Sequence, residues 1–174
     1  MQEQSGSEFS EPDVGACGQV LVIEDHETIV AGLRALSDSV QLTGYELVFA
    51  SSMRDAAGLL NPRVELLLLD AQLTAAEGGS ETSLSALKAL QRQVPNVPIG
   101  IFSGDDSESA VVRAIAAGAA GFIPKRTPPK LLLAAIDLMR HGGLYVPANL
   151  IGTVGGTSDS ATPKRRMRAT DVTA

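Results

Sequence analysis

The sequence predicts an α/β protein built on a doubly wound, five-stranded parallel sheet. Between Gln19 and Gly143, short apolar runs alternate with segments of helical period. Four of the five runs are apolar nearly throughout, which is typical of strands buried on both faces. Because parallel neighbours need a crossover, the intervening helices would cover both faces of the sheet. Five such units suit a small open sheet, whereas an eight-unit barrel needs about 250 residues.

Each predicted strand is too short for a typical helix. In chain order the runs are QVLVI at 19–23, YELVFA at 45–50, ELLLL at 65–69, VPIGIF at 97–102 and AGFI at 120–123. The segments between them repeat apolar residues at the spacing of one helix face. They include Ile29, Leu33, Leu36 and Val40 after the first strand, then 110–117 and 131–139, with a stop at the His-Gly-Gly of 141–143.

The two ends of the chain differ in composition from this central part. Residues 1–18 are acidic and rich in Gly and Ser, and residues from about 152 are rich in Gly, Ser and Thr and then basic. We therefore predict a disordered arm at 1–18, one folded domain at 19–143 and a partly disordered linker or tail at 144–174. The basic run at 164–168 is expected to be solvated.

Charge and cysteine content narrow the function classes. The net charge of −6 opposes binding of nucleic acid or an anionic membrane by the whole chain. The single cysteine, Cys17, excludes an intrachain disulfide and fits a reducing compartment. No apolar run resembles a signal peptide or approaches the roughly 20 residues of a membrane span. We expect a cytoplasmic protein without a membrane partner.

Polar side chains follow four of the five predicted strands. Glu24 and Asp25 follow the first, Asp70 the third, Ser103 the fourth and Lys125 the fifth. In open parallel sheets the ligand site lies beyond the carboxyl ends of the strands, so these side chains are expected to meet. Close carboxylates repel one another by roughly 4 kcal/mol per pair, which a hard cation would offset. Few protein oxygens plus water favour Mg²⁺ over Ca²⁺.

This arrangement predicts phosphoryl chemistry. A carboxylate beside Mg²⁺ can accept a phosphoryl group and form an acyl phosphate. An ammonium and a hydroxyl can bind the oxygens of that group. Lys125 and Ser103 are the residues with this chemistry.

Four segments together resemble the signature segments of bacterial response-regulator receiver domains. They are VLVIEDH, LLLLDAQL, IGIFSGDD and AAGFIPKR, in that order and at similar spacing. The resemblance covers about 19–143 and implies a flavodoxin-like (CheY-like) fold with strand order 2-1-3-4-5. It also implies a signalling domain that catalyses only its own phosphorylation and dephosphorylation, rather than an enzyme with a separate substrate.

The resemblance assigns roles to the candidate residues. It implies that Asp70 is phosphorylated, that Glu24 and Asp25 bind Mg²⁺ together with Asp70, and that Gln72 binds it through its backbone carbonyl. Ser103 and Lys125 would hold the phosphoryl group. Phe122 would be the aromatic switch that turns inward when Ser103 moves.

The segment LLLAAIDLMRHGGLYVPANL resembles the NarL/FixJ group, in which a LuxR-type DNA-binding domain follows the receiver. It implies a sensor histidine kinase as partner, a phosphorylation-linked homodimer, and DNA binding only through a domain beyond this chain. The chain would be the receiver of such a transcriptional regulator. The alternative is a stand-alone receiver that acts by protein contacts or as a phosphate sink.

Three departures from the family pattern concern the loops. Thr74 stands where a proline is usual, and the loop from Gln72 to Ser80 is longer than usual. Arg126 replaces the common proline after Lys125, so a cis peptide bond is not expected there.

Other readings of these residues are weaker. A haloacid-dehalogenase-like phosphatase would need an acid two residues after its nucleophile, and Gln72 stands there. A flavodoxin-like FMN site is opposed by the acidic start of the loop after the first strand. His26 follows the acidic pair, but the other histidine, His141, is distant in sequence, so we expect neither to be a metal ligand.

Overall fold

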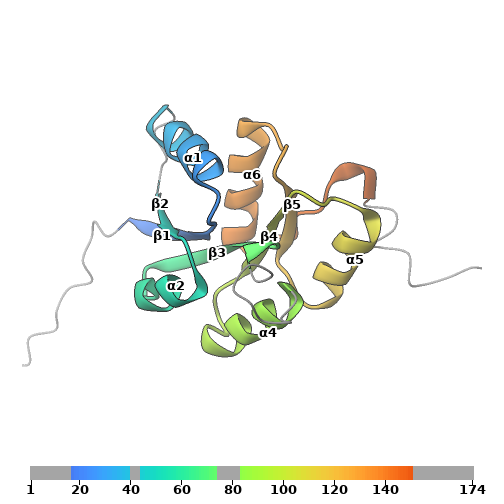
Figure 1. Cartoon of the computed structure of the whole chain (residues 1–174), viewed down its shortest axis with the longest axis horizontal. Helices are drawn as coiled ribbons and strands as arrows, with labels where there is room; N and C mark the ends of the chain where they lie inside the picture. The colour runs from blue at the N-terminus through green and yellow to red at the C-terminus, as the bar shows by residue number, and fades with distance from the viewer. Residues whose placement is uncertain (1–16, 40–43, 74–82, 151–174) are drawn as a thin grey trace, which may run out of the picture.

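The computed structural model describes residues 17–39, 44–73 and 83–150, which form one five-stranded parallel sheet with helices on both faces (Figure 1). The strands are β1 (Gly18–Ile23), β2 (Tyr45–Ala50), β3 (Val64–Asp70), β4 (Ile99–Ser103) and β5 (Gly121–Pro124). All pairings are parallel, and the order across the sheet is β2-β1-β3-β4-β5. The predicted fold class and strand order are therefore confirmed.

The helices of the described residues form two layers. They are α1 (Glu27–Ser39), α2 (Met53–Leu59), α4 (Ser83–Gln93), α5 (Glu108–Ala116) and α6 (Pro129–Arg140), followed by a short 3₁₀ helix, η1 (Ala148–Leu150). Buried residues of α1 and α6 pack on one face of the sheet, and those of α2, α4 and α5 pack on the other. None of these helices is long and apolar enough to span a membrane.

The four consecutive leucines of β3 show why the strand is apolar on both faces. Leu66 and Leu68 belong to the core beneath α1 and α6, whereas Leu67 and Leu69 belong to the core beneath α2, α4 and α5. All four are at most 1% exposed. Successive side chains of a strand point to opposite faces, so a strand between two helical layers must be apolar at every position.

The two edge strands are less regular. β2 has an exposed Glu46 and three half-buried residues, as expected of an edge. At the other edge, Gly121 of β5 forms an isolated bridge with Tyr145, and the Phe122 amide donates to the Tyr145 carbonyl at 2.9 Å. Leu150 is 7% exposed and joins the core. Residues 144–150, beyond the expected domain end at 143, thus contact the sheet.

Several predictions from sequence fall on residues that the structure does not describe. They are the arm at 1–16, the end of the first helical pattern at Val40, the altered position Thr74 with the loop after it, and the tail from residue 151. The predicted division into arm, domain and tail therefore stays a prediction.

Candidate functional site

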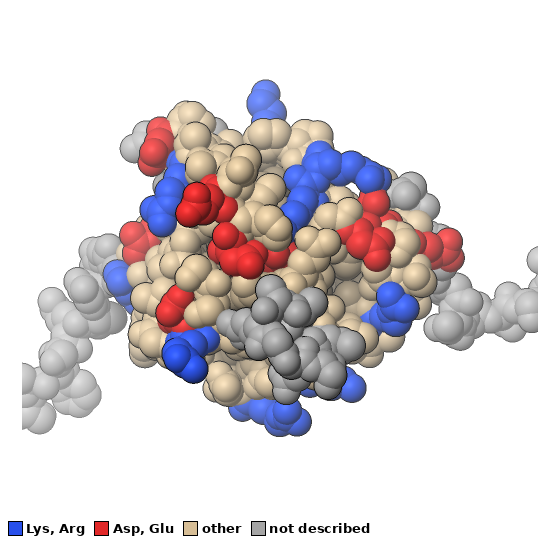
Figure 2. Space-filling view, in the orientation of Figure 1, with Lys and Arg blue, Asp and Glu red and all other residues tan. Residues whose placement is uncertain are grey.

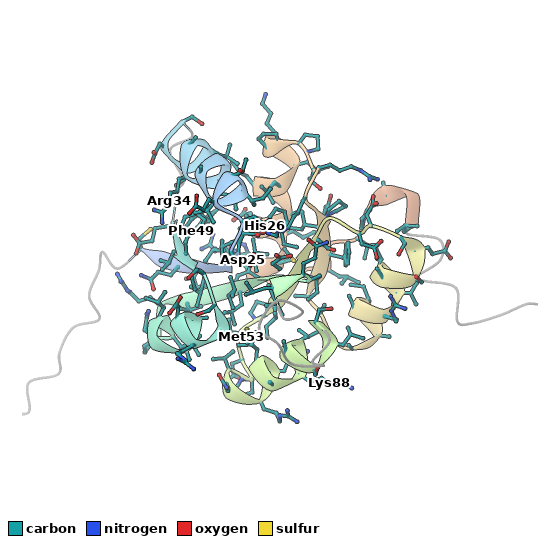
Figure 3. All side chains as sticks on the ribbon, viewed as in Figure 1. Asp25, His26, Arg34, Phe49, Met53 and Lys88 are labelled. Carbon is teal, nitrogen blue, oxygen red and sulfur yellow. The ribbon has the colours of Figure 1, made fainter. Side chains whose placement is uncertain are left out.

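Three carboxylates meet at the carboxyl end of the sheet, where the sequence predicts them. Asp70 is the last residue of β3, and Glu24 and Asp25 follow the neighbouring strand β1. Asp70 and Glu24 are 0% and 1% exposed, whereas the Asp25 side chain is 38% exposed. Acidic side chains gather near the middle of the face that Figure 2 shows, and Asp25 is labelled in Figure 3. Two buried carboxylates and one accessible one therefore share a single pocket.

Lys125 is the cation of this pocket. It follows β5, and its Nζ lies 2.7 Å from Glu24 Oε2 and 3.1 Å from Asp70 Oδ2. Its amide donates to the Ser103 carbonyl at 2.7 Å, which continues the alignment of β4 and β5 beyond their ends. One ammonium thus faces two buried carboxylates, and the charge of the pocket is not balanced by Lys125 alone.

The environment of Asp70 disfavours its charged form. Burial raises the pKa of Asp70, and the nearby charge of Glu24 acts in the same direction. The Gln72 amide, which donates to Asp70 Oδ1 at 3.0 Å, and Lys125 lower that pKa and offset part of the effect. An additional cation would therefore stabilise the ionised pocket.

The donor atoms of the pocket fit a divalent cation. Glu24 Oε2 and Asp70 Oδ2 are buried and lack a hydrogen bond of regular geometry among the described residues, although Lys125 lies close to both. One donor atom from each of Glu24, Asp25, His26 and Asp70 lies within 4.8 Å of the others. Carboxylate oxygens at this spacing suit a hard ion such as Mg²⁺.

His26 also lies in this cluster, and the expectation that it is not a metal ligand stays a prediction. Its Nδ1 lies 2.6 Å from Glu24 Oε1, 3.0 Å from Asp25 Oδ1 and 3.6 Å from Asp70 Oδ2. The His26 amide also donates to Glu24 Oε1 at 3.1 Å. The signal that could have revealed it is its position in the turn between β1 and α1. Three carboxylates surround the His26 ring, and the distance in sequence between the two histidines does not indicate this contact.

Ser103 is the last residue of β4, and Phe122 lies in the neighbouring strand β5. Ser103 is 2% exposed, and its hydroxyl accepts a hydrogen bond from the Asp105 amide at 3.1 Å. Phe122 is also 2% exposed and belongs to the core beneath α2, α4 and α5. Both residues line a cavity of about 240 Å³ that also reaches Gln72. The hydroxyl and the ring therefore share one space, with the ring already in the interior.

The loop after Lys125 is held by an ion pair between Arg126 and Asp106, which follows β4. No peptide bond is cis in the described ranges, so the Lys125–Arg126 bond is trans, as the missing proline predicts.

The backbone carbonyl of Gln72 stays a predicted ligand of Mg²⁺.

A cleft of about 490 Å³ opens beside the acidic cluster, between α1 and the β2–α2 connection. Glu24, Asp25 and Glu27 lie on one side of it, and Phe49 lines its apolar part. The Arg34 guanidinium stacks over the Phe49 ring at 4.5 Å from the ring centroid (Figure 3). The accessible carboxylate of the site therefore borders an open cleft lined by both acidic and apolar side chains.

The chain matches one family model, that of the response regulator receiver domain, over residues 20–137. It is 27% identical over 142 residues to the glycerol metabolism activator of Pseudomonas putida, and the alignment covers 80% of this chain and 61% of that protein. It is also 27% identical to the transcriptional regulatory protein UhpA of Salmonella typhimurium, and that alignment covers 86% of this chain and 73% of UhpA. The chain thus spans about three fifths of the first relative's length.

A similar fold occurs in a crystal structure of a LuxR family DNA-binding response regulator from Silicibacter pomeroyi. The TM-score is 0.62 and the identity is 30%, over 76% of this chain and 98% of that chain. The isolated receiver domain of RcsB from Salmonella enterica serovar Typhimurium aligns with a TM-score of 0.64 at 17% identity, which concerns the fold alone. The family match over residues 20–137 includes every residue of the acidic pocket.

Proposed function

Because this chain belongs to the response regulator receiver domain family, the signalling domains of two-component systems, we propose that its acidic pocket accepts a phosphoryl group on Asp70. The observation that carries the proposal is the buried Asp70 carboxylate, with Lys125 at 3.1 Å and two further carboxylates beside it. A histidine kinase is the donor expected for this family. The roles below are assigned on that basis.

Each residue of the pocket has a distinct task in this proposal. Glu24, Asp25, Asp70 and the Gln72 backbone carbonyl would hold Mg²⁺, which when bound offsets the charge of the phosphoryl group. Lys125 would move from the two carboxylates to the new phosphoryl oxygens. In the transfer, an Asp70 oxygen forms a bond to phosphorus while the bond to the donor's nitrogen or oxygen breaks, and the leaving group keeps that electron pair.

Ser103 and Phe122 would report the change to the rest of the domain. The Ser103 hydroxyl, which accepts from the Asp105 amide, would donate its own proton to a phosphoryl oxygen, and the turn of the side chain would move the loop after β4. Phe122 lines the same cavity, so the movement changes the space next to its ring. The phosphoryl group adds nearly two negative charges, which can shift a two-state surface made of α5, β5 and α6.

The output that we propose is transcriptional regulation through a DNA-binding domain, with phosphorylation-linked dimerisation. The names of the relatives support it, and so does the share of their length that this chain leaves uncovered. A stand-alone receiver is the alternative. Sedimentation velocity with and without beryllofluoride and Mg²⁺ tests the dimer: an unchanged sedimentation coefficient would contradict it.

Intact-protein mass spectrometry tests the phosphoacceptor. The protein is incubated with acetyl phosphate or phosphoramidate and Mg²⁺, and we expect the mass gain of one phosphoryl group. Asp70→Asn should remove this gain, whereas Asp38→Asn, at an exposed position of α1, is the matched control. No adduct on the unmodified protein, or an adduct that persists in Asp70→Asn, would overturn the proposal.

A further inference from the structure

We infer that the His26 imidazole competes with Mg²⁺ for the oxygens of the acidic pocket and turns away when the ion binds. The inference rests on the proposed function of the same pocket, and it gives His26 a regulatory role in place of a ligand role. The His26 ring and the Asp25 carboxylate are the most exposed side chains of the pocket (Figure 3). His26 would thus set the Mg²⁺ concentration at which Asp70 can accept a phosphoryl group.

The His26 ring donates into the space that the carboxylates share. Its Nδ1 lies 2.6 Å from Glu24 Oε1, 3.0 Å from Asp25 Oδ1 and 3.6 Å from Asp70 Oδ2. A carboxylate oxygen accepts a hydrogen bond, so Nδ1 carries the hydrogen toward Glu24. An ion that binds these oxygens needs bonds of about 2.0 to 2.1 Å, and a hydrogen directed at the same oxygens repels it. The ring contact and the ion therefore compete.

Every oxygen of the two buried carboxylates already has a donor nearby. Lys125 Nζ lies 2.7 Å from Glu24 Oε2 and 3.1 Å from Asp70 Oδ2. The Gln72 amide donates to Asp70 Oδ1 at 3.0 Å. Glu24 Oε1 is left to His26, which contacts it with both its ring and its amide. An ion therefore gains full access to these oxygens only when a donor withdraws.

His26 is the donor that can withdraw at low cost. Its side chain is 51% exposed, so water replaces the hydrogen bond that the ring gives up. The Lys125 side chain is 12% exposed, and its withdrawal would leave two buried carboxylates without their cation. The ring of His26 is thus expected to leave before the ammonium of Lys125 moves.

The backbone of His26 is fixed independently of the ring. Its carbonyl accepts hydrogen bonds from the amides of Ile29 and Val30 at 3.0 and 3.1 Å, in the first turn of α1. Its own amide donates to Glu24 Oε1 at 3.1 Å. Rotation about the side-chain bonds alone can therefore release the ring. For the same reason, His26→Ala removes the ring contact and leaves the backbone contacts in place.

Calorimetric titration of Mg²⁺ into the unmodified protein, His26→Ala, His26→Asn and His141→Ala tests the competition. We expect His26→Ala to bind Mg²⁺ about three- to tenfold more tightly, because one competing hydrogen bond is lost. Asparagine keeps a donor nitrogen near the position of Nδ1, so His26→Asn should gain less. His141 is 71% exposed and belongs to no metal-binding cluster of the described residues, so its replacement should leave the affinity unchanged.

Differential scanning calorimetry separates competition from a purely structural role. In EDTA, His26→Ala should have a lower melting temperature than the unmodified protein, because Glu24 loses a donor. This difference should shrink as Mg²⁺ increases, since the variant binds the ion more tightly. A purely structural role would lower the melting temperature by the same amount at every Mg²⁺ concentration, and that result would contradict the competition.

Phosphorylation by acetyl phosphate, followed by mass, is the functional arm. The rate in His26→Ala should exceed that of the unmodified protein at low Mg²⁺ and equal it at saturating Mg²⁺. An unchanged or weakened Mg²⁺ affinity in His26→Ala would overturn the inference. If Mg²⁺ binds but gives no phosphoryl adduct, the proposed function fails, whereas the affinities still decide the role of His26. An adduct together with equal affinities refutes the role of His26 alone.

Discussion

At the scale of single residues, the site is defined by a shortage of positive charge. Lys125 lies within 3.1 Å of two carboxylates, both of them buried. Burial raises the pKa of Asp70, which means that its ionised form is less favourable in the folded protein than in the unfolded chain. The ionised Asp70 therefore lowers the free energy of unfolding of the metal-free protein, as buried charges at functional sites often do.

Replacement of Asp70 by Asn should stabilise the metal-free protein by about 1 to 2 kcal/mol at neutral pH. The raised pKa fixes the sign: the stability that protonated Asp70 contributes is present below its unfolded pKa and is lost as pH rises through its folded pKa. In the presence of EDTA, the difference in unfolding free energy between the variant and the unmodified protein should thus increase from acidic to neutral pH. Urea unfolding at several pH values measures it, and a difference that decreases would contradict this account.

Replacement of Lys125 by Met should have the opposite effect. It leaves Glu24 and Asp70 buried without their cation, and loss of one partner of a buried pair costs about 3 to 5 kcal/mol. Because a second carboxylate already competes for this lysine, the lower end is expected. Lys130→Met, at the exposed start of α6, is the control and should change the unfolding free energy by less than about 0.5 kcal/mol.

At the scale of elements, the edge strand β5 is fixed by glycine and by the segment after α6. A Cβ atom on Gly121 would lie 2.6 Å from Met139 Sδ and 2.8 Å from the Tyr145 carbonyl oxygen. Met139 is fully buried in α6, and Tyr145 pairs with this strand. The close approach of helix, strand and following segment needs a residue without a side chain.

Gly121→Ala should therefore destabilise the protein by about 1 to 3 kcal/mol, because backbone and buried sulfur must both shift. Gly32 in α1 is the matched control, since a Cβ there meets nothing within 4 Å. Gly32→Ala should stabilise the protein by about 0.5 to 1 kcal/mol through helix propensity. Chemical denaturation of both variants measures the two changes in unfolding free energy. Changes of the same sign would contradict the close packing around Gly121.

At the scale of the whole molecule, the pocket links β1, β3 and β5 at one end of the sheet. Glu24 and Asp25 follow β1, Asp70 ends β3, and Lys125 follows β5. These positions come together only in the folded chain, so a cation that binds them stabilises the native state against the unfolded one. Cation binding and global stability are therefore coupled.

Mg²⁺ should raise the melting temperature in a concentration-dependent way, with a gain of about 2.7 kcal/mol at 100 times the dissociation constant. Asp25→Asn removes the accessible carboxylate of the pocket and should weaken this dependence. Asp137→Asn, on the exposed face of α6, should keep it. Differential scanning calorimetry over a Mg²⁺ series measures the effect, and a melting temperature independent of Mg²⁺ would contradict the cation site.

The sequence by itself determined the elements, the sheet and the set of acidic positions. Unbroken apolar runs indicate strands that are buried on both faces. Because the strands are parallel, the polar residues that follow them come together at one edge of the sheet. The tertiary structure decided what local patterns cannot encode. Among these are the imidazole of His26 among three carboxylates, the sharing of Lys125 between Glu24 and Asp70, and the return of Tyr145 to β5. Each of these contacts depends on how far a side chain reaches and on how distant segments pack together. No periodicity or spacing in the sequence indicates such a contact.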